Sequence, residues 1–136
     1  PMPTGRDHLT AAAFQGRVWG IGGRTSFMGT QYTTVEIYDS ATGAWSTGLP
    51  LPVGRGGLAA ATLDERLYVF GGEAPFRIFS AHEMYEVAGQ RWIGKDPMRT
   101  PRHGIGAAAI GNKIYVPGGA TQPGLAATDV NEAYTP

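Results

Sequence analysis

The feature that most constrains the fold is an internal repeat of nearly fifty residues. An arginine stands 16 residues before each of three glycine pairs, and an alanine-rich stretch follows that arginine. Each pair is preceded by an aromatic residue and followed by a tyrosine, and a glutamate stands two residues before that tyrosine. The glycine pairs are 49 and 47 residues apart, at Gly22-Gly23, Gly71-Gly72 and Gly118-Gly119. A repeat of this length indicates an array of similar structural units.

Each unit divides into segments that are typical of short β-strands. Residues 8–14, 58–63 and 105–110 are rich in Ala and Gly, as expected of an inner strand where several sheets converge on an axis. Second strands are expected at 17–21, 66–70 and 113–116, after tight turns such as Gln15-Gly16 and Gly111-Asn112. A third strand would end at Tyr38, Tyr85 or Tyr134, and a fourth would carry Trp45 or Trp92.

Composition agrees with an all-β chain. Glycine makes up 21 of 136 residues, about twice the usual share of ~7%, and charged residues are scarce. Glycine at the pairs suits backbone that needs positive φ or a close approach, whereas the Tyr and Trp positions suit packing between neighbouring units. Pro117 lacks an N–H, so we expect the strand that it ends to be weakened there.

These marks resemble the kelch repeat, whose unit is one four-stranded blade of a β-propeller. The resemblance covers essentially the whole chain, and the segment from Tyr38-Asp39 to Trp45 follows the kelch pattern closely. It departs at Glu86 and Thr135, where Asp is usual. The resemblance implies one region, 1–136, of about three kelch-type β-propeller blades, at about 5–50, 54–98 and 101–136, with the outer strand of the last blade missing.

Three blades do not surround an axis, because propellers close with ~4–8 blades. The chain would therefore be half of a six-bladed propeller or a fragment of a larger one. We favour a homodimer of two such halves, because a partner copy would cover the exposed sheet edges. The sequence does not indicate what supplies the outer strand of the third blade.

Variation in length is confined to one loop of the unit. From the second glycine to the tyrosine the chain runs 15, 13 and 15 residues, whereas the other intervals are constant. This loop lies on the same face as the connections between blades, so we predict a binding face from 24–33, 73–81 and 120–127, with 6–8, 55 and 102–103. The candidate partner-binding residues are Arg6, His8, Arg24, Phe27, Tyr32, Arg55, Phe76, Arg77, Phe79, Arg102 and His103.

The candidates fall into two groups. Arg6, Arg55 and Arg102 recur, so they either bond backbone carbonyls as part of the scaffold or grip a carboxylate of a ligand. The remaining aromatic and arginine residues do not recur, and with Met28, Gln31 and Gln122 they form a mixture typical of interface hot spots.

The sequence favours a noncatalytic protein-binding scaffold. The formal charge is zero, which argues against nucleic-acid binding, and no apolar run suits a membrane span. Cysteine is absent, and the three histidines have no zinc-ligand spacing, so we expect no catalytic residue, metal or cofactor. The alternative is a carbohydrate-binding or carbohydrate-processing propeller, epimerase-like or oxidase-like, in which the rim arginines would matter most. The cellular compartment is not indicated.

Overall fold

A computed structural model describes residues 1–136 and contains fifteen strands and no helix. Strands β1 (Thr10–Phe14), β2 (Arg17–Ile21), β3 (Val35–Asp39) and β4 (Ala44–Thr47) form one antiparallel sheet in that order. In the second sheet, β5 (Ala59–Leu63), β6 (Arg66–Phe70), β9 (His82–Glu86) and β10 (Arg91–Gly94) repeat this arrangement. The third sheet has only β11 (Ala108–Ile110), β12 (Lys113–Pro117) and β15 (Asn131–Tyr134). These are blades 1 to 3, and the predicted all-β fold of kelch-type blades is confirmed. No helix is long and apolar enough to cross a bilayer.

The predicted second strands 17–21 and 66–70 coincide with β2 and β6, whereas the inner strands begin later than predicted. The inner strand of blade 3 has three residues, and its pairing with β12 begins at Ala108 opposite Tyr115. It therefore lacks partners for Val116 and Pro117. Because Pro117 has no N–H to donate, this shortening agrees with the predicted weakness.

Two short hairpins lie within loops predicted as irregular. In blade 2, β7 (Glu73–Ala74) pairs with β8 (Arg77–Ile78), and in blade 3, β13 (Ala120–Gln122) pairs with β14 (Leu125–Ala127). The blade 1 loop has single backbone bridges instead, one of them between Arg24 and Gln31. We call these three connections the strand 2–3 loops.

The core lies between the blades. Side chains alternate across β6, so Leu67 and Val69 pack towards blade 1, whereas Tyr68 and Phe70 pack towards blade 3. Trp92 packs on Tyr85 and donates from Nε1 to the carbonyl oxygen of Leu49, which ties blade 2 to blade 1. The predicted inter-blade packing is confirmed at these two positions, whereas Tyr38 and Trp45 pack on each other within blade 1.

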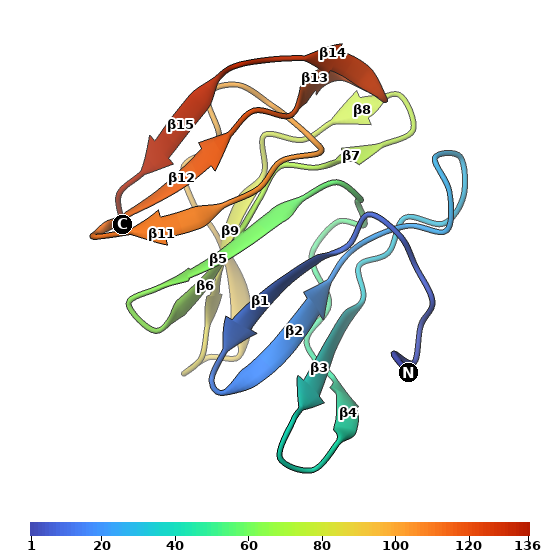
Figure 1. The fold of residues 1–136 in the computed structure, drawn as a ribbon, viewed down its shortest axis with the longest axis vertical. Helices are drawn as coiled ribbons and strands as arrows, with labels where there is room; N and C mark the ends of the chain where they lie inside the picture. Colours follow the sequence, from blue (N-terminus) through green and yellow to red (C-terminus); the bar gives the residue numbers. More distant parts are fainter.

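Figure 1 shows the inner strands β1, β5 and β11 side by side at the centre of the fan of blades. The tips of the strand 2–3 loops lie together on the right of this view, as the light-blue loop of blade 1 and the hairpins β7–β8 and β13–β14. The tight turns β1–β2, β5–β6 and β11–β12 lie on the opposite side. The prediction that the variable loops share one side is therefore confirmed.

Candidate binding face

Each glycine pair joins a strand 2–3 loop to the segment that enters the blade. Gly72 has a φ of 109°, and a Cβ there would lie 2.9 Å from the carbonyl oxygen of Gly56. Only glycine allows this approach, and the same geometry recurs in all three blades. The residue after each arginine thereby forms a backbone bridge to the residue after each glycine pair: Asp7 to Arg24, Gly56 to Glu73, and His103 to Ala120.

The guanidinium groups of the recurrent arginines contact atoms of their own blades. Arg55 has no exposed side-chain surface; it donates from Nε to the carbonyl oxygen of Gly71 at 2.7 Å and from Nη1 to that of Val53. Its Nη2 donates to a carboxylate oxygen of Glu83 at 2.5 Å. The guanidinium therefore fastens the start of the blade to the end of its second strand and to its third strand.

Arg6 makes the corresponding contacts in blade 1, whereas Arg102 donates only to backbone carbonyl oxygens of blade 3, such as that of Gly118. Arg6 lies 2.6 Å from Glu36, and Arg102 lies 3.5 Å from Glu132. Burial raises the pKa of Glu36, but hydrogen bonds from Thr4 and Arg6 and the charge of Arg6 outweigh it, so this pKa lies below its usual value. Of the two roles left open for the three arginines, the geometry supports the scaffold role.

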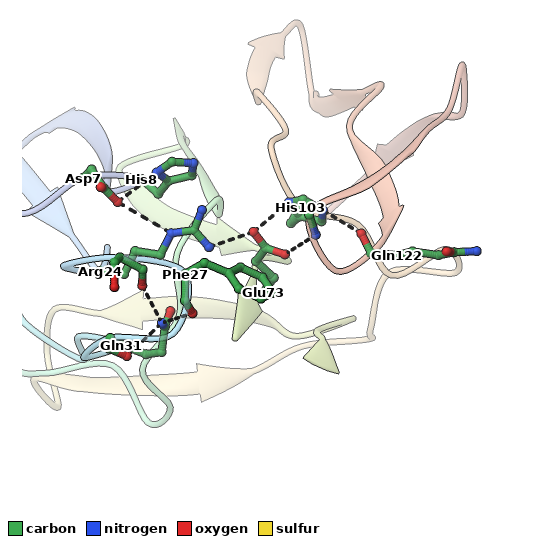
Figure 2. Close-up of polar contacts among 11 residues, drawn as sticks. Asp7, His8, Arg24, Phe27, Gln31, Glu73, His103 and Gln122 are labelled. Atoms are coloured by element: carbon green, nitrogen blue, oxygen red, sulfur yellow. Dashed lines mark hydrogen bonds and ion pairs between the residues drawn. The ribbon is translucent and has the colours of Figure 1, made fainter. Parts of the chain in front are cut away.

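The non-recurring polar residues meet in a network that crosses all three blades (Figure 2). Arg24 of blade 1 donates from Nη1 to Glu73 of blade 2 at 2.9 Å, and its Nε lies 3.6 Å from Asp7. The same Glu73 oxygen lies 3.3 Å from Nδ1 of His103 in blade 3. The second Glu73 oxygen accepts the backbone N–H of Gly124, in the β13–β14 hairpin, at 2.9 Å. One carboxylate thus contacts both neighbouring blades.

Arg24 and His103 were predicted on an exposed face, and the structure buries both. His103 Nε2 lies 2.9 Å from the carbonyl oxygen of Gln122, so each ring nitrogen faces an oxygen atom. The Arg24 guanidinium lies over the Phe27 ring, 5.5 Å from its centre, and Phe27 is half-buried. Both side chains can be buried because their polar groups have partners, among them Glu73 of the adjacent blade.

Phe79 is also buried, contrary to the exposed position predicted for it. The Arg77 guanidinium lies 4.5 Å from the centre of the Phe79 ring, and that of Arg55 lies 5.8 Å away. The ring is therefore enclosed by two cations, a favourable contact for an aromatic face. Arg77 itself remains exposed.

Phe76 is the most exposed large apolar side chain, at 80%, and its φ is +61°. Met28 in the blade 1 loop and Leu125 in the blade 3 hairpin are 64% and 63% exposed. Each strand 2–3 loop thus carries one exposed apolar side chain at or near its tip, and sequence reasoning had not selected Leu125. Exposed apolar side chains that lie on the same side of a protein suit an interaction site.

The two remaining predicted residues lie at the edges of the face. His8 is exposed, and its Nδ1 lies 2.9 Å from Asp7 Oδ1. Tyr32 is half-buried, and its backbone joins the blade 1 loop to the next blade through Gly23 and Arg55. The structure does not gather three or more metal-ligating side chains of His, Cys, Asp or Glu.

Glu73 lies in the predicted range 73–81, but it was not among the candidate residues. Only one repeat has an acid at this position, so comparison of the repeats gave no signal for it. Opposite charges at equivalent positions of adjacent repeats, Arg24 and Glu73, were the available clue.

Sequence reasoning also missed a cavity of about 420 Å³ between blades 2 and 3, lined in part by Phe70, His82 and Tyr134. His82 stacks on Phe70 with 4.3 Å between ring centres. Burial lowers the pKa of His82. No predicted candidate lines this cavity.

Comparison with known proteins agrees with this geometry. A family model described as the kelch motif matches residues 5–51, which span blade 1 and the connection that follows it. A search of curated proteins gave no match. Blades 2 and 3 repeat the arginine and the glycine pair of the matched segment, and blade 2 also repeats its order of four strands. Residues 5–51 therefore form a kelch motif, and the two following blades have a related arrangement.

Proposed function

We propose that the chain is a noncatalytic scaffold that binds a protein partner through the strand 2–3 loops. The observation that carries this proposal is that three separate blades place their variable loops on one side, each with an exposed apolar side chain. Kelch repeats commonly serve as protein-binding scaffolds, which agrees with it.

The chemistry of this face suits a protein surface. Phe76, Met28 and Leu125 are apolar, and the exposed Arg77 adds a planar cation beside them. Aromatic, Met and Arg side chains are enriched where protein interfaces gain most of their affinity.

The carbohydrate alternative is not supported by a comparable observation. That alternative requires rim arginines whose guanidinium groups are free to bind a ligand. The guanidinium groups of Arg6, Arg55 and Arg102 instead donate to backbone carbonyls and pair with glutamates of their own blades. We therefore propose a protein partner.

The test is partner capture with a face variant and a matched control. Met28→Ser, Phe76→Ser and Leu125→Ser combined remove the apolar tips, whereas Val87→Ser removes an exposed valine from the β9–β10 turn on the other side. Partners captured by the unaltered chain are identified by mass spectrometry, and their affinities are then measured with purified proteins. We expect the triple variant to weaken binding at least about thirtyfold, since hot-spot truncations cost ~2 kcal/mol or more. Equal binding by the triple variant and the unaltered chain would refute the loop face.

A further inference from the structure

Glu73 is buried beneath the binding face, so it can influence how the loops are arranged without being exposed on the face. Its side chain is 1% exposed, so a partner that docks on the loops cannot contact it. Its two oxygens nevertheless receive groups from both flanking blades: Arg24 from blade 1, and His103 and Gly124 from blade 3. Arg24 and Gly124 lie 49 and 51 residues from Glu73 in the sequence.

The three loops meet at this carboxylate. The Gly124 N–H belongs to the turn of the β13–β14 hairpin, and Leu125 follows directly. Arg24 begins the blade 1 loop, and Phe27 of that loop lies so near Gly124 that a Cβ there would be 4.0 Å from the ring. Glu73 itself begins β7, whose hairpin carries Phe76. The exposed side chains Met28, Phe76 and Leu125 are therefore four, three and one residues from Arg24, Glu73 and Gly124, respectively.

The arrangement of the three loops depends on the negative charge of Glu73. Hydrogen bonds to a charged group are stronger than neutral ones, and a buried charge without its partner is costly. Loss of the carboxylate leaves Arg24 with Asp7 as its only anionic contact, at 3.6 Å, and leaves the Gly124 N–H without its acceptor. Both outer loops then lose their contact with the Glu73 side chain, and the blade 1 loop keeps only its backbone hydrogen bonds to Arg55 of blade 2.

We propose that Glu73 is a positioning residue that holds the strand 2–3 loops of all three blades in one arrangement, so that their apolar tips present a single preformed surface. The proposal rests on the proposed function, because it concerns the same face. A partner that meets a preformed surface loses less conformational entropy on binding.

Amide hydrogen exchange of the free protein, followed by NMR, tests the proposal without a partner. Glu73→Gln keeps the shape of the side chain, removes its charge and replaces one of the two acceptor oxygens that face Arg24 and Gly124 by an NH2 donor. Glu86→Gln is the matched control, because Glu86 pairs with the exposed Arg91 at the turn side of the same blade. In Glu73→Gln we expect exchange to quicken about tenfold at Tyr32 and at Thr128, whose N–H groups hold the loops of blades 1 and 3 to Gly23 and Gly119. Glu86→Gln should leave both rates unchanged.

The result that overturns the proposal is faster exchange confined to the blade 2 hairpin, 73–79, with the other two loops unaffected. If Glu73→Gln unfolds the chain, Arg24→Gln replaces it. Arg24→Gln should quicken exchange at Gly124 as well as in its own loop, because Glu73 then lacks a counter-charge; an effect limited to the blade 1 loop overturns the proposal. Exchange measures only the loops, whereas partner capture tests the proposed function, so the two failures are distinguishable.

Discussion

The three arginine–glutamate pairs allow one substitution to be compared in three blades of the same chain. The pairs differ in length and burial. Glu36 and Glu83 lie 2.6 and 2.5 Å from their arginines and are nearly buried, whereas Glu132 lies 3.5 Å from Arg102 and is 19% exposed. We therefore predict that replacement of each glutamate by glutamine destabilises the fold to different extents.

The magnitudes follow from burial and distance. A hydrogen bond to a charged group contributes about 1.5–3 kcal/mol, so Glu36→Gln and Glu83→Gln should each lower the free energy of unfolding by about that amount. Glu132→Gln should cost less than about 1 kcal/mol, as for partly exposed ion pairs. Arg55→Met should cost about 3–5 kcal/mol, because it leaves Glu83 buried without its partner and removes the donor to Gly71.

The assay is urea unfolding monitored by tryptophan fluorescence, since Trp19 is buried and reports on the packing of blade 1 against blade 2. The slope of the free energy against urea should be equal in all variants, so that midpoints report stability alone. Glu86→Gln, in an exposed pair, is the control and should cost less than about 0.5 kcal/mol. Equal losses for the three glutamate variants, or the largest loss at Glu132, would show that burial and distance do not set the contribution of these pairs to stability.

Three further predictions concern a turn, a buried histidine and assembly. Asp64 and Glu65 form the β5–β6 turn with φ of 50° and 56°; Glu65→Gly should relieve left-handed strain and raise the free energy of unfolding by about 0.5–1 kcal/mol, whereas Glu65→Ala should give no gain. The pKa of His82 is lowered by burial, so the unfolded chain binds the proton first and stability should fall as pH drops below about 6.5; urea unfolding at several pH values should show a smaller fall for His82→Asn. We also propose that two copies pair, and light scattering coupled to size exclusion should give twice the chain mass of 14.4 kDa; a monomer at micromolar concentration would contradict pairing.

The strands could be predicted because the repeat reports three times on the same local requirements. Gly72 must approach the carbonyl oxygen of Gly56, and the equivalent contacts recur in the other blades. Likewise the burial of Leu67 and Tyr68 on opposite faces of β6 follows from strict alternation along a strand. A residue that every blade requires recurs in every repeat, so comparison of the repeats with one another identifies it.

The binding face could be predicted only as far as its location. Its β7–β8 hairpin has two residues in each strand, which is too short for alternation to give a signal. The burial of Arg24 and Phe79 depends on groups that come close only in the folded chain, such as Glu73 for the arginine and Arg55 for the aromatic ring. Composition indicates that such residues suit an interface, but partners found in the fold decide which of them remain exposed.

Arg55 and Arg24 show how one residue type can serve two different purposes in a repeat protein. Arg55 pairs with Glu83 of its own blade, and the equivalent pairs recur, so this contact stabilises any blade irrespective of its neighbours. Arg24 pairs with Glu73 of the next blade, and no equivalent pair exists between Glu73 and blade 3, where Ala120 holds the corresponding position. The contact therefore favours blade 1 beside blade 2 in particular. Burial of a charge is tolerated at both positions, but only at Arg24 does it depend on the neighbouring blade. The residues that break the repeat therefore add a contact that is specific to blades 1 and 2.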